Sequence, residues 1–167
     1  NDYYTKRDGK PFDGVKLYTD YRELLLNKDI DAVLISTPDH THALVGAAAA
    51  RAGKHIYMQK PASLTIAEGR VISNVVQKSG VKFQIGSQQR STEQFRYAAE
   101  LVRNGRIGDL KKVYVGLPGD PPGGKKDQMP VPGNLNYDLW LASTPEVYYT
   151  VDRVHPHSGY DRPGWLR

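Results

Sequence analysis

Three short apolar runs of β type are spaced along the first half of the chain, at residues 32–36, 55–59 and 81–85. Between successive runs there is room for one helix and two short loops, which is the repeat of βαβ units. Because parallel strands need such crossover connections, the pattern predicts a parallel sheet with helices packed against it.

The segments between these runs carry helix signals. Residues 40–52 are rich in Ala and end before Gly53, a residue type favoured just after a helix. Thr65 and Glu68 have the spacing of a capping box, and Gly80 ends the helix that they open. We predict that this second helix turns one apolar stripe toward the sheet. The stripe consists of Val71, Ile72, Val75 and Val76.

Further elements are predicted on either side of this pattern. Before it, residues 15–18 read as a strand, and Asp20 opens a short helix that runs through Leu26. After it, Ser91 opens a helix that stops at Gly105. The residues of that helix predicted to face inward are Phe95, Ala98, Ala99 and Val102.

The pattern changes after residue 108. Residues 110–117 alternate as a strand, and 118–132 are dense in Pro and Gly, which indicates an irregular loop. One strand and a long loop bury little core. We therefore predict two units, a partial parallel α/β domain over 1–90 and the incomplete beginning of a second α/β domain over 91–167.

Composition and charge narrow the class of protein. The 167 residues include no Cys, which excludes thiolate zinc sites, a cysteine nucleophile and a disulfide scaffold. With 39% hydrophobic and 25% charged residues the chain resembles an ordinary globular protein. The net charge of +5 is spread along the chain, so we expect neither nucleic acid nor a membrane as partner.

Polar groups follow each of the three apolar runs. They are Thr-Pro-Asp-His-Thr-His at 37–42, Lys-Pro at 60–61 and Ser-Gln-Gln-Arg at 87–90. In an open parallel sheet, ligands bind outside the carboxyl ends of the strands, so these groups are expected along one edge. Their hydroxyls, imidazoles, amine, amides and guanidinium suit a hydroxyl-rich ligand and a diphosphate, although each alone is also ordinary loop chemistry.

The strings DAVLISTPDHTH (31–42) and GKHIYMQKP (53–61) together resemble the Gfo/Idh/MocA oxidoreductases, the glucose–fructose oxidoreductase and inositol dehydrogenase type. The resemblance extends from about Tyr18 to Pro118 and resumes around 137–141. It implies an NAD(P)-binding Rossmann domain and then an α/β domain with a predominantly antiparallel open sheet. It also implies NAD or NADP as cofactor, a carbohydrate or cyclitol substrate, and a homo-oligomer formed through the second domain's sheet.

The resemblance also suggests roles for single residues. Lys60 matches a lysine that lies between nicotinamide and substrate, which makes it the candidate catalytic residue. Gln59 departs from the family pattern, which has Glu there, and Pro61 matches a proline that follows a cis peptide bond. The expected cofactor-binding residues are Thr37, Pro38, His42, Gln59, Lys60 and Pro61, and the expected substrate-binding residues are Lys60, Gln89 and Arg90.

Three functions stay open at this point. The first is hydride transfer between NAD(P) and a secondary hydroxyl or ketone. The second is an NAD-dependent glycoside hydrolase that oxidises its substrate transiently and eliminates the leaving group. The third is a non-catalytic sugar-binding relative, which the neutral Gln59 favours.

Several motifs are absent or incomplete. Neither Gly-x-Gly-x-x-Gly nor the family's Asp-x-x-x-His occurs, so we expect an internal fragment of a longer protein. The pairs His40/His42 and His155/His157 lack a third ligand, and we predict no metal site. Residues 119–125 only partly match a phosphate-binding loop. Trp140 weakly matches a family tryptophan, and a buried core role is the better interpretation.

Overall fold

The computed structural model describes residues 2–10, 14–116, 127–150 and 153–154. The two histidines at 155 and 157 and the loop at 119–125 lie outside these ranges. The elements in chain order are α1 (Asp2–Asp8), α2 (Tyr21–Leu26), β1 (Ala32–Ile35), η1 (Asp39–Thr41), α3 (His42–Arg51), β2 (His55–Gln59), α4 (Ile66–Ser79), β3 (Phe83–Gly86), η2 (Gln88–Ser91), α5 (Glu93–Arg103) and α6 (Tyr137–Leu141).

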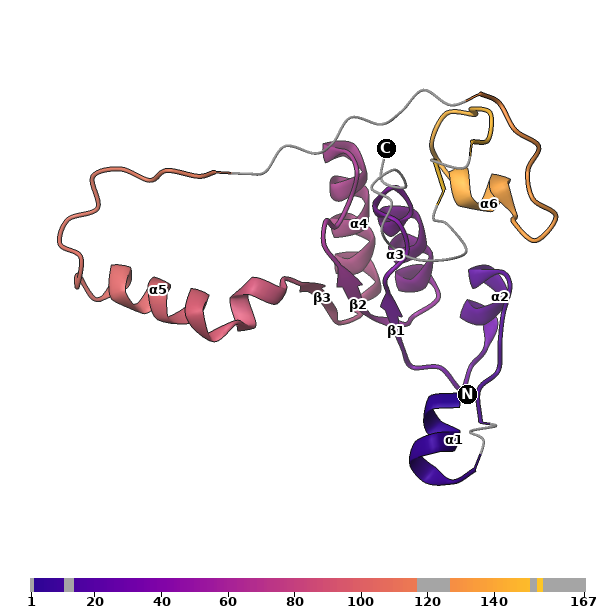
Figure 1. Ribbon diagram of the computed structural model, residues 1–167, viewed down its shortest axis with the longest axis horizontal. Helices are drawn as coiled ribbons and strands as arrows, with labels where there is room; N and C mark the ends of the chain where they lie inside the picture. Colours follow the sequence, from indigo (N-terminus) through magenta and orange to yellow (C-terminus); the bar gives the residue numbers. More distant parts are fainter. Residues whose placement is uncertain (1, 11–13, 117–126, 151–152, 155–167) are drawn as a thin grey trace.

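The three predicted strands form one parallel sheet in the order β1-β2-β3, as predicted (Figure 1). Ala32 pairs with His55, and Ile56 pairs with Phe83. Helices α3 and α4 pack on one face of this sheet. On the other face Leu34 is 69% exposed and Tyr57 is 50% exposed. Within the described residues, therefore, only one face of the sheet is covered.

The core lies where α3 meets β2 and α4. Met58 and Ala49 are completely buried there, next to Ile72. A Cβ atom on Gly46 would overlap Cε of Met58 and would lie 2.7 Å from Cδ1 of Ile72. The Ala- and Gly-rich face of α3 therefore lets this helix lie directly on the sheet.

The predicted ends of α4 are confirmed. Thr65 Oγ1 accepts a hydrogen bond from the Glu68 amide, and the Glu68 carboxylate accepts one from the Thr65 amide, which makes a capping box. Gly80 follows the helix with φ +71°, the left-handed conformation that glycine adopts without strain. Ile72 is buried, and Val75 and Val76 pack against the core. Val71 is 49% exposed because it lies at the flank of the stripe, so its prediction was wrong.

Two predicted strands do not form. Residues 15–18 and 110–116 are irregular, and Val15 and Val113 are 59% and 66% exposed. A strand is stable when a neighbour satisfies its main-chain hydrogen-bonding groups, and no described segment pairs with either of these. The open antiparallel sheet expected within 91–167 is likewise not seen in the described part of that region and stays a prediction.

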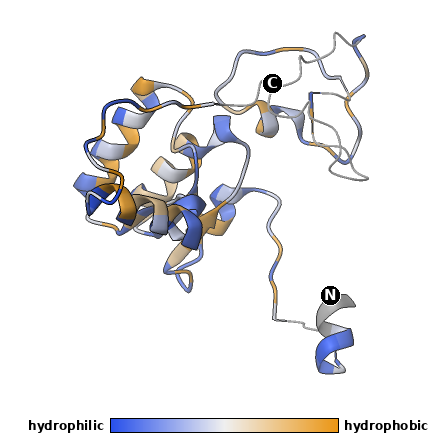
Figure 2. Cartoon of the chain, turned by 60° about the vertical axis from the view of Figure 1, so that its left-hand side comes forward, coloured by the Kyte–Doolittle hydropathy of each residue, from blue (hydrophilic) through white to orange (hydrophobic). Residues whose placement is uncertain are grey.

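Helix α5 forms, but it begins at Glu93 with Thr92 as N-cap, because Ser91 still belongs to η2. None of its residues is buried, and the predicted inward face is exposed, with Phe95 58% and Val102 40% accessible. Figure 1 shows this helix away from α3 and α4. The apolar stripe of α5 predicts a buried side, but Phe95 and Val102 stay accessible in the described structure. Figure 2 shows hydrophobic and hydrophilic residues side by side on the helices.

A second, small cluster forms near the C-terminal part of the chain from Tyr137, Leu141, Tyr149 and Val154. Trp140 packs against this cluster and stacks on Tyr137, with ring centroids 5.7 Å apart. The ring of Trp140 is only half-buried, so the expected core tryptophan in fact lies at the border of its cluster.

No helix in the described ranges combines the length and apolar character needed to cross a membrane.

Candidate functional site

The parallel register brings the three predicted loops to one edge of the sheet. Ile35 pairs with Met58, and Gln59 pairs with Gly86, so β1, β2 and β3 end side by side. The segments that begin at Ser36, Lys60 and Ser87 therefore leave the sheet at the same edge, as predicted from the sequence.

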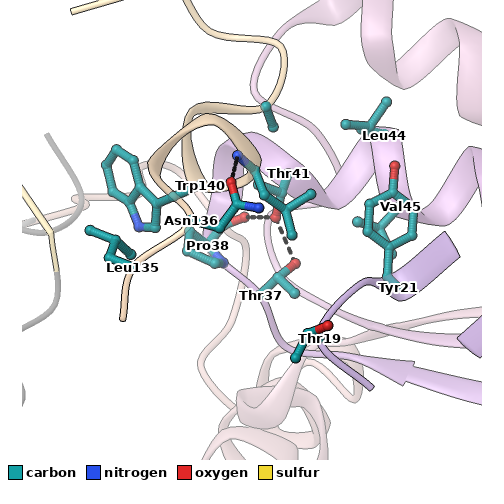
Figure 3. A pocket seen from close by; sticks show the side chains of 12 residues that line it. Thr19, Tyr21, Thr37, Pro38, Thr41, Leu44, Val45, Leu135, Asn136 and Trp140 are labelled. Atoms are coloured by element: carbon teal, nitrogen blue, oxygen red, sulfur yellow. Dashed lines mark hydrogen bonds between the residues drawn. The ribbon is translucent and has the colours of Figure 1, made fainter. Parts of the chain in front are cut away.

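The loop after β1 is held by a small hydrogen-bond network (Figure 3). Thr41 Oγ1 lies 2.7 Å from the hydroxyl of Thr37 and 2.7 Å from the carbonyl oxygen of Pro38. The Thr41 amide also donates to the Pro38 carbonyl, at 2.9 Å. Because Thr41 is itself buried, it fixes the shape of a loop whose Thr37 side chain stays exposed.

His42 connects this loop to the next one. Its side chain is completely buried; Nδ1 lies 2.6 Å from the carbonyl oxygen of Pro61, and Nε2 lies 2.7 Å from that of Thr37. The peptide bond between Lys60 and Pro61 is cis, as the resemblance implied. The structure thus shows His42 between two loops, and its contact with a cofactor stays a prediction.

The end of β2 presents Gln59 and Lys60. Gln59 is half-buried, and its Oε1 accepts a hydrogen bond of 2.9 Å from the Lys60 amide. An amide oxygen makes this bond as a carboxylate would, but without the charge. Lys60 and Pro61 are exposed, and no acceptor in the described part of the chain lies within hydrogen-bonding distance of Nζ of Lys60.

Gln89 and Arg90 lie in η2, just after β3. Both are exposed, and the Arg90 amide donates to the carbonyl oxygen of Ser87 at 3.1 Å. They line a depression of about 440 Å³ together with residues of α5. Thr37 and Pro38 line a different cavity, so the predicted residues share an edge of the sheet without sharing one pocket.

The cavity beside Thr37 and Pro38 has a volume of about 320 Å³ and mostly apolar walls (Figure 3). One wall comes from α2, η1 and α3, and the opposite wall comes from α6 and the residues before it. Local sequence patterns did not indicate most of this lining. The missed residues are Thr19, Tyr21, Leu44, Val45, Leu135, Asn136, Leu139 and Ala142.

His40 connects the wall formed by α2, η1 and α3 to the wall formed by α6. Its Nε2 lies 2.5 Å from the carbonyl oxygen of Trp140, and the two rings meet edge to face with centroids 4.9 Å apart. Asn136 accepts a hydrogen bond from the Leu139 amide and so caps α6, the helix that carries Trp140. The Asn-x-x-Leu spacing of this cap was a local signal, but the contact across 100 positions of the chain had none.

Two groups near this cavity have shifted pKa values. The hydrogen bond from the Arg22 side chain, assisted by one from the Arg22 amide, lowers the pKa of Asp20, the N-cap of the helix that begins with Tyr21. Burial raises the pKa of Tyr137, whose ring stacks on Trp140. In the described ranges there is no cluster of three His, Asp or Glu side chains arranged to hold a metal ion.

The cavity has the size and the polarity of a small-molecule pocket. Its volume is at the lower end of the ~300–1,000 Å³ that is typical of ligand pockets. Apolar walls with the hydroxyls of Thr19 and Thr37 at the rim suit a flat ring that carries polar substituents. A diphosphate would need the glycine-rich turn that this sequence does not contain.

Comparison with known proteins gives consistent matches. The chain is 40% identical over 90 residues to an uncharacterized oxidoreductase of Bacillus subtilis, YrbE, which covers 54% of this chain and 26% of the relative. It is 31% identical over 128 residues to a myo-inositol 2-dehydrogenase of Thermotoga maritima. The aligned part makes up 75% of this chain and 37% of that relative. The chain thus spans well under half the length of these two curated relatives.

Among solved structures, an apo scyllo-inositol dehydrogenase of Lactobacillus casei matches with a TM-score of 0.54 and 33% identity, over 65% of this chain and 31% of that protein. The same enzyme with bound NAD(H) and scyllo-inositol matches equally. A family sequence profile described as "oxidoreductase family, NAD-binding Rossmann fold" matches residues 10–87, the region that holds the parallel sheet. Residues 10–87 therefore carry the NAD-binding Rossmann fold of the Gfo/Idh/MocA oxidoreductase family.

Proposed function

We propose that the protein transfers hydride between NAD or NADP and a secondary hydroxyl or ketone of a sugar or cyclitol. The observation that carries this proposal is the shared edge of β1, β2 and β3, where a buried His42 joins the loop of Thr37 to that of Lys60 and Pro61. The match to an inositol dehydrogenase with bound NAD(H) supports the substrate class.

In this proposal the cavity beside Thr37 and Pro38 receives a ring of the cofactor. Gln59 and Pro61 contact the cofactor from the neighbouring strand end, and the buried His42 takes part by holding the loops of Thr37 and Pro61. The nicotinamide, when bound, accepts or supplies the hydride. Lys60 orients the reacting hydroxyl and holds its proton at Nζ, since the side chain is exposed and free to turn toward a ligand.

Gln89 and Arg90 bind substrate hydroxyl groups from the neighbouring strand end. Their donors and acceptors are accessible, which suits a hydroxyl-rich ligand. The division at residue 90, a second domain with an open antiparallel sheet, and a homo-oligomer formed through that sheet are parts of the same proposal.

The test uses the longest protein that the gene encodes, with NAD or NADP and myo-inositol or scyllo-inositol as first substrates. Formation of the reduced cofactor is followed by its absorbance. In the Lys60→Ala variant we expect kcat to fall by about 10²–10⁴-fold, the usual effect of removing a positioned acid or base. Lys78→Ala is the control, because Lys78 lies in the last turn of α4, which α3 separates from the cavity side.

Turnover of Lys60→Ala within about threefold of wild type would contradict the assignment of Lys60. Cleavage of a glycoside without net formation of reduced cofactor would replace the dehydrogenase by a hydrolase that uses NAD transiently. Sugar binding without turnover in wild type and variant alike would indicate a non-catalytic relative.

A further inference from the structure

The buried ring of His42 contacts a main-chain carbonyl oxygen at each of its two nitrogens. Both ring nitrogens lie within 2.7 Å of a main-chain carbonyl oxygen, one from Pro61 and one from Thr37. Carbonyl oxygens only accept, so both hydrogen bonds form together only when both ring nitrogens carry a proton.

The two carbonyls belong to segments that the sheet no longer holds. The pairing between β1 and β2 ends at Ile35 and Met58, before Thr37 and Pro61 are reached. Beyond that point, the hydrogen bonds of the His42 ring are the ones that join the two loops in the described part of the chain. The ring itself is fixed, because His42 opens α3 and is completely enclosed.

We propose that His42 is a positioning residue. Its two hydrogen bonds hold the Pro61 carbonyl, and with it the adjacent Lys60, at a fixed place relative to Thr37 and Pro38. The consequence for catalysis rests on the proposed function of Lys60, whereas the bridge between the loops does not.

Two substitutions separate the halves of this bridge. In His42→Asn the side-chain amide nitrogen takes about the place of Nδ1 and can donate to Pro61, and in His42→Gln it takes about the place of Nε2 and can donate to Thr37. Each variant therefore keeps one loop contact and loses the other. Both variants remove an aromatic ring from the same site, which makes them controls for each other.

The readout is the backbone order parameter from ¹⁵N relaxation, measured on the chain without ligand. In wild type we expect values of about 0.85 at Thr37, Lys60 and Ala62, as in rigid backbone. His42→Gln should lower the order parameters of Lys60 and Ala62 toward ~0.6 and leave that of Thr37 unchanged. His42→Asn should leave Lys60 and Ala62 rigid and lower the value of Thr37 by a smaller amount, because the hydrogen bonds of Thr41 still hold that loop. If the order parameters fell equally in both loops, or fell in neither loop, the proposal would be overturned.

His55→Gln is the matched control. His55 lies at the opposite end of β2, where its Nδ1 accepts a hydrogen bond of 3.0 Å from the Lys82 amide. Losing that contact should leave the order parameters of Lys60 and Ala62 at their wild-type values. Loosening of Lys60 in this variant too would show that any change in β2 has the effect, and would contradict a specific role of His42.

Wild-type protein gives a check that needs no variant to fold. A long-range ¹H–¹⁵N spectrum of the imidazole, recorded at the pH of the relaxation experiment, shows which ring nitrogens of His42 carry protons. Protons on both nitrogens support the bridge. A nitrogen without a proton means that one carbonyl receives no hydrogen bond, which overturns the proposal.

Kinetics on the longest encoded protein separate this inference from the proposed function. We expect kcat to fall more in His42→Gln than in His42→Asn, with KM changed less than kcat, because only Asn retains the contact to Pro61. If the loops loosen as expected but the wild-type protein shows no turnover, the positioning role of His42 is supported and the proposed oxidoreductase function is contradicted. If the order parameters of the loops stay unchanged while Lys60→Ala abolishes turnover, the proposed function is supported and the positioning role of His42 is contradicted.

Discussion

Helices α4 and α5 carry similar sequence signals and differ in what surrounds them. Each is amphipathic, and each begins after a threonine. Helix α4 buries Ile72 against α3 and β2, whereas α5 buries none of its residues. Thr65 caps α4 through its hydroxyl, but Thr92 makes no such bond. Apolar periodicity therefore predicted both helices correctly and did not reveal which one has a partner.

The same contrast separates two segments predicted as strands. Residues 55–59 pair on both sides and become the central strand β2. Residues 110–116 alternate in the way a strand does but pair with nothing in the described chain. Propensity selects an extended backbone, and a strand needs in addition a neighbour that satisfies its amides and carbonyls.

The largest expected effect is the removal of a core side chain from the packed region. Met58→Ala should lower the free energy of unfolding by about 2–5 kcal/mol, since Met58 is completely buried and truncation leaves a cavity. Phe95→Ala on α5 is the counterpart, and it should change stability by less than about 0.5 kcal/mol, as for a surface residue. Urea denaturation measures both. If Met58→Ala and Phe95→Ala lowered the free energy of unfolding by similar amounts, α5 would be packed in solution, and the contrast between α4 and α5 would not hold.

Overpacking the same core should have the next largest effect. Gly46→Ala places a Cβ against Met58 and Ile72 and should cost about 1–3 kcal/mol, despite the better helix propensity of Ala. In the double variant with Met58→Ala, the cost should be smaller than the sum of the single costs, because the added methyl group enters the vacated space. Strict additivity would contradict the close approach of α3 to β2.

The caps of the two helices differ by a smaller amount. Thr65→Ala removes one half of the capping box and should cost about 0.5–2 kcal/mol, whereas Thr92→Ala should cost no more than about 0.3 kcal/mol. Thr65→Ser keeps the hydroxyl and serves as control. An equal cost at the two threonines would mean that α5 is capped in solution by a contact absent here.

The smallest effect expected is the pH response of the cap of α2. The side-chain hydrogen bond from Arg22 lowers the pKa of Asp20, so the folded state favours the ionised carboxylate. The stabilisation is present above the unfolded pKa of about 4 and is lost as the pH falls through the lowered folded value. Asp20→Asn should cap the helix without this dependence. NMR titration of Asp20 with a midpoint at or above about 4 would contradict the contact.

Sequence alone was sufficient for the βαβ core. Short apolar runs, a capping box at Thr65 and glycines at 53 and 80 are local signals, and the structure confirms the elements that they predicted. The shared edge of the three loops followed as well, since parallel pairing leaves no other place for the carboxyl ends of the strands. The motifs 31–42 and 53–61 were enough to indicate the family.

Tertiary structure alone decided the contacts between distant segments. Enclosure of His42 between the carbonyls of Thr37 and Pro61, and the approach of Trp140 to His40, depend on how loops are placed once the sheet has formed. The approach of Trp140 to His40 places α6 opposite Thr37, and the cavity lies between them. Local sequence patterns record the preference of a backbone segment and the side that it would bury. They hold no information on which distant partner covers that side, because burial is a property of the assembled chain.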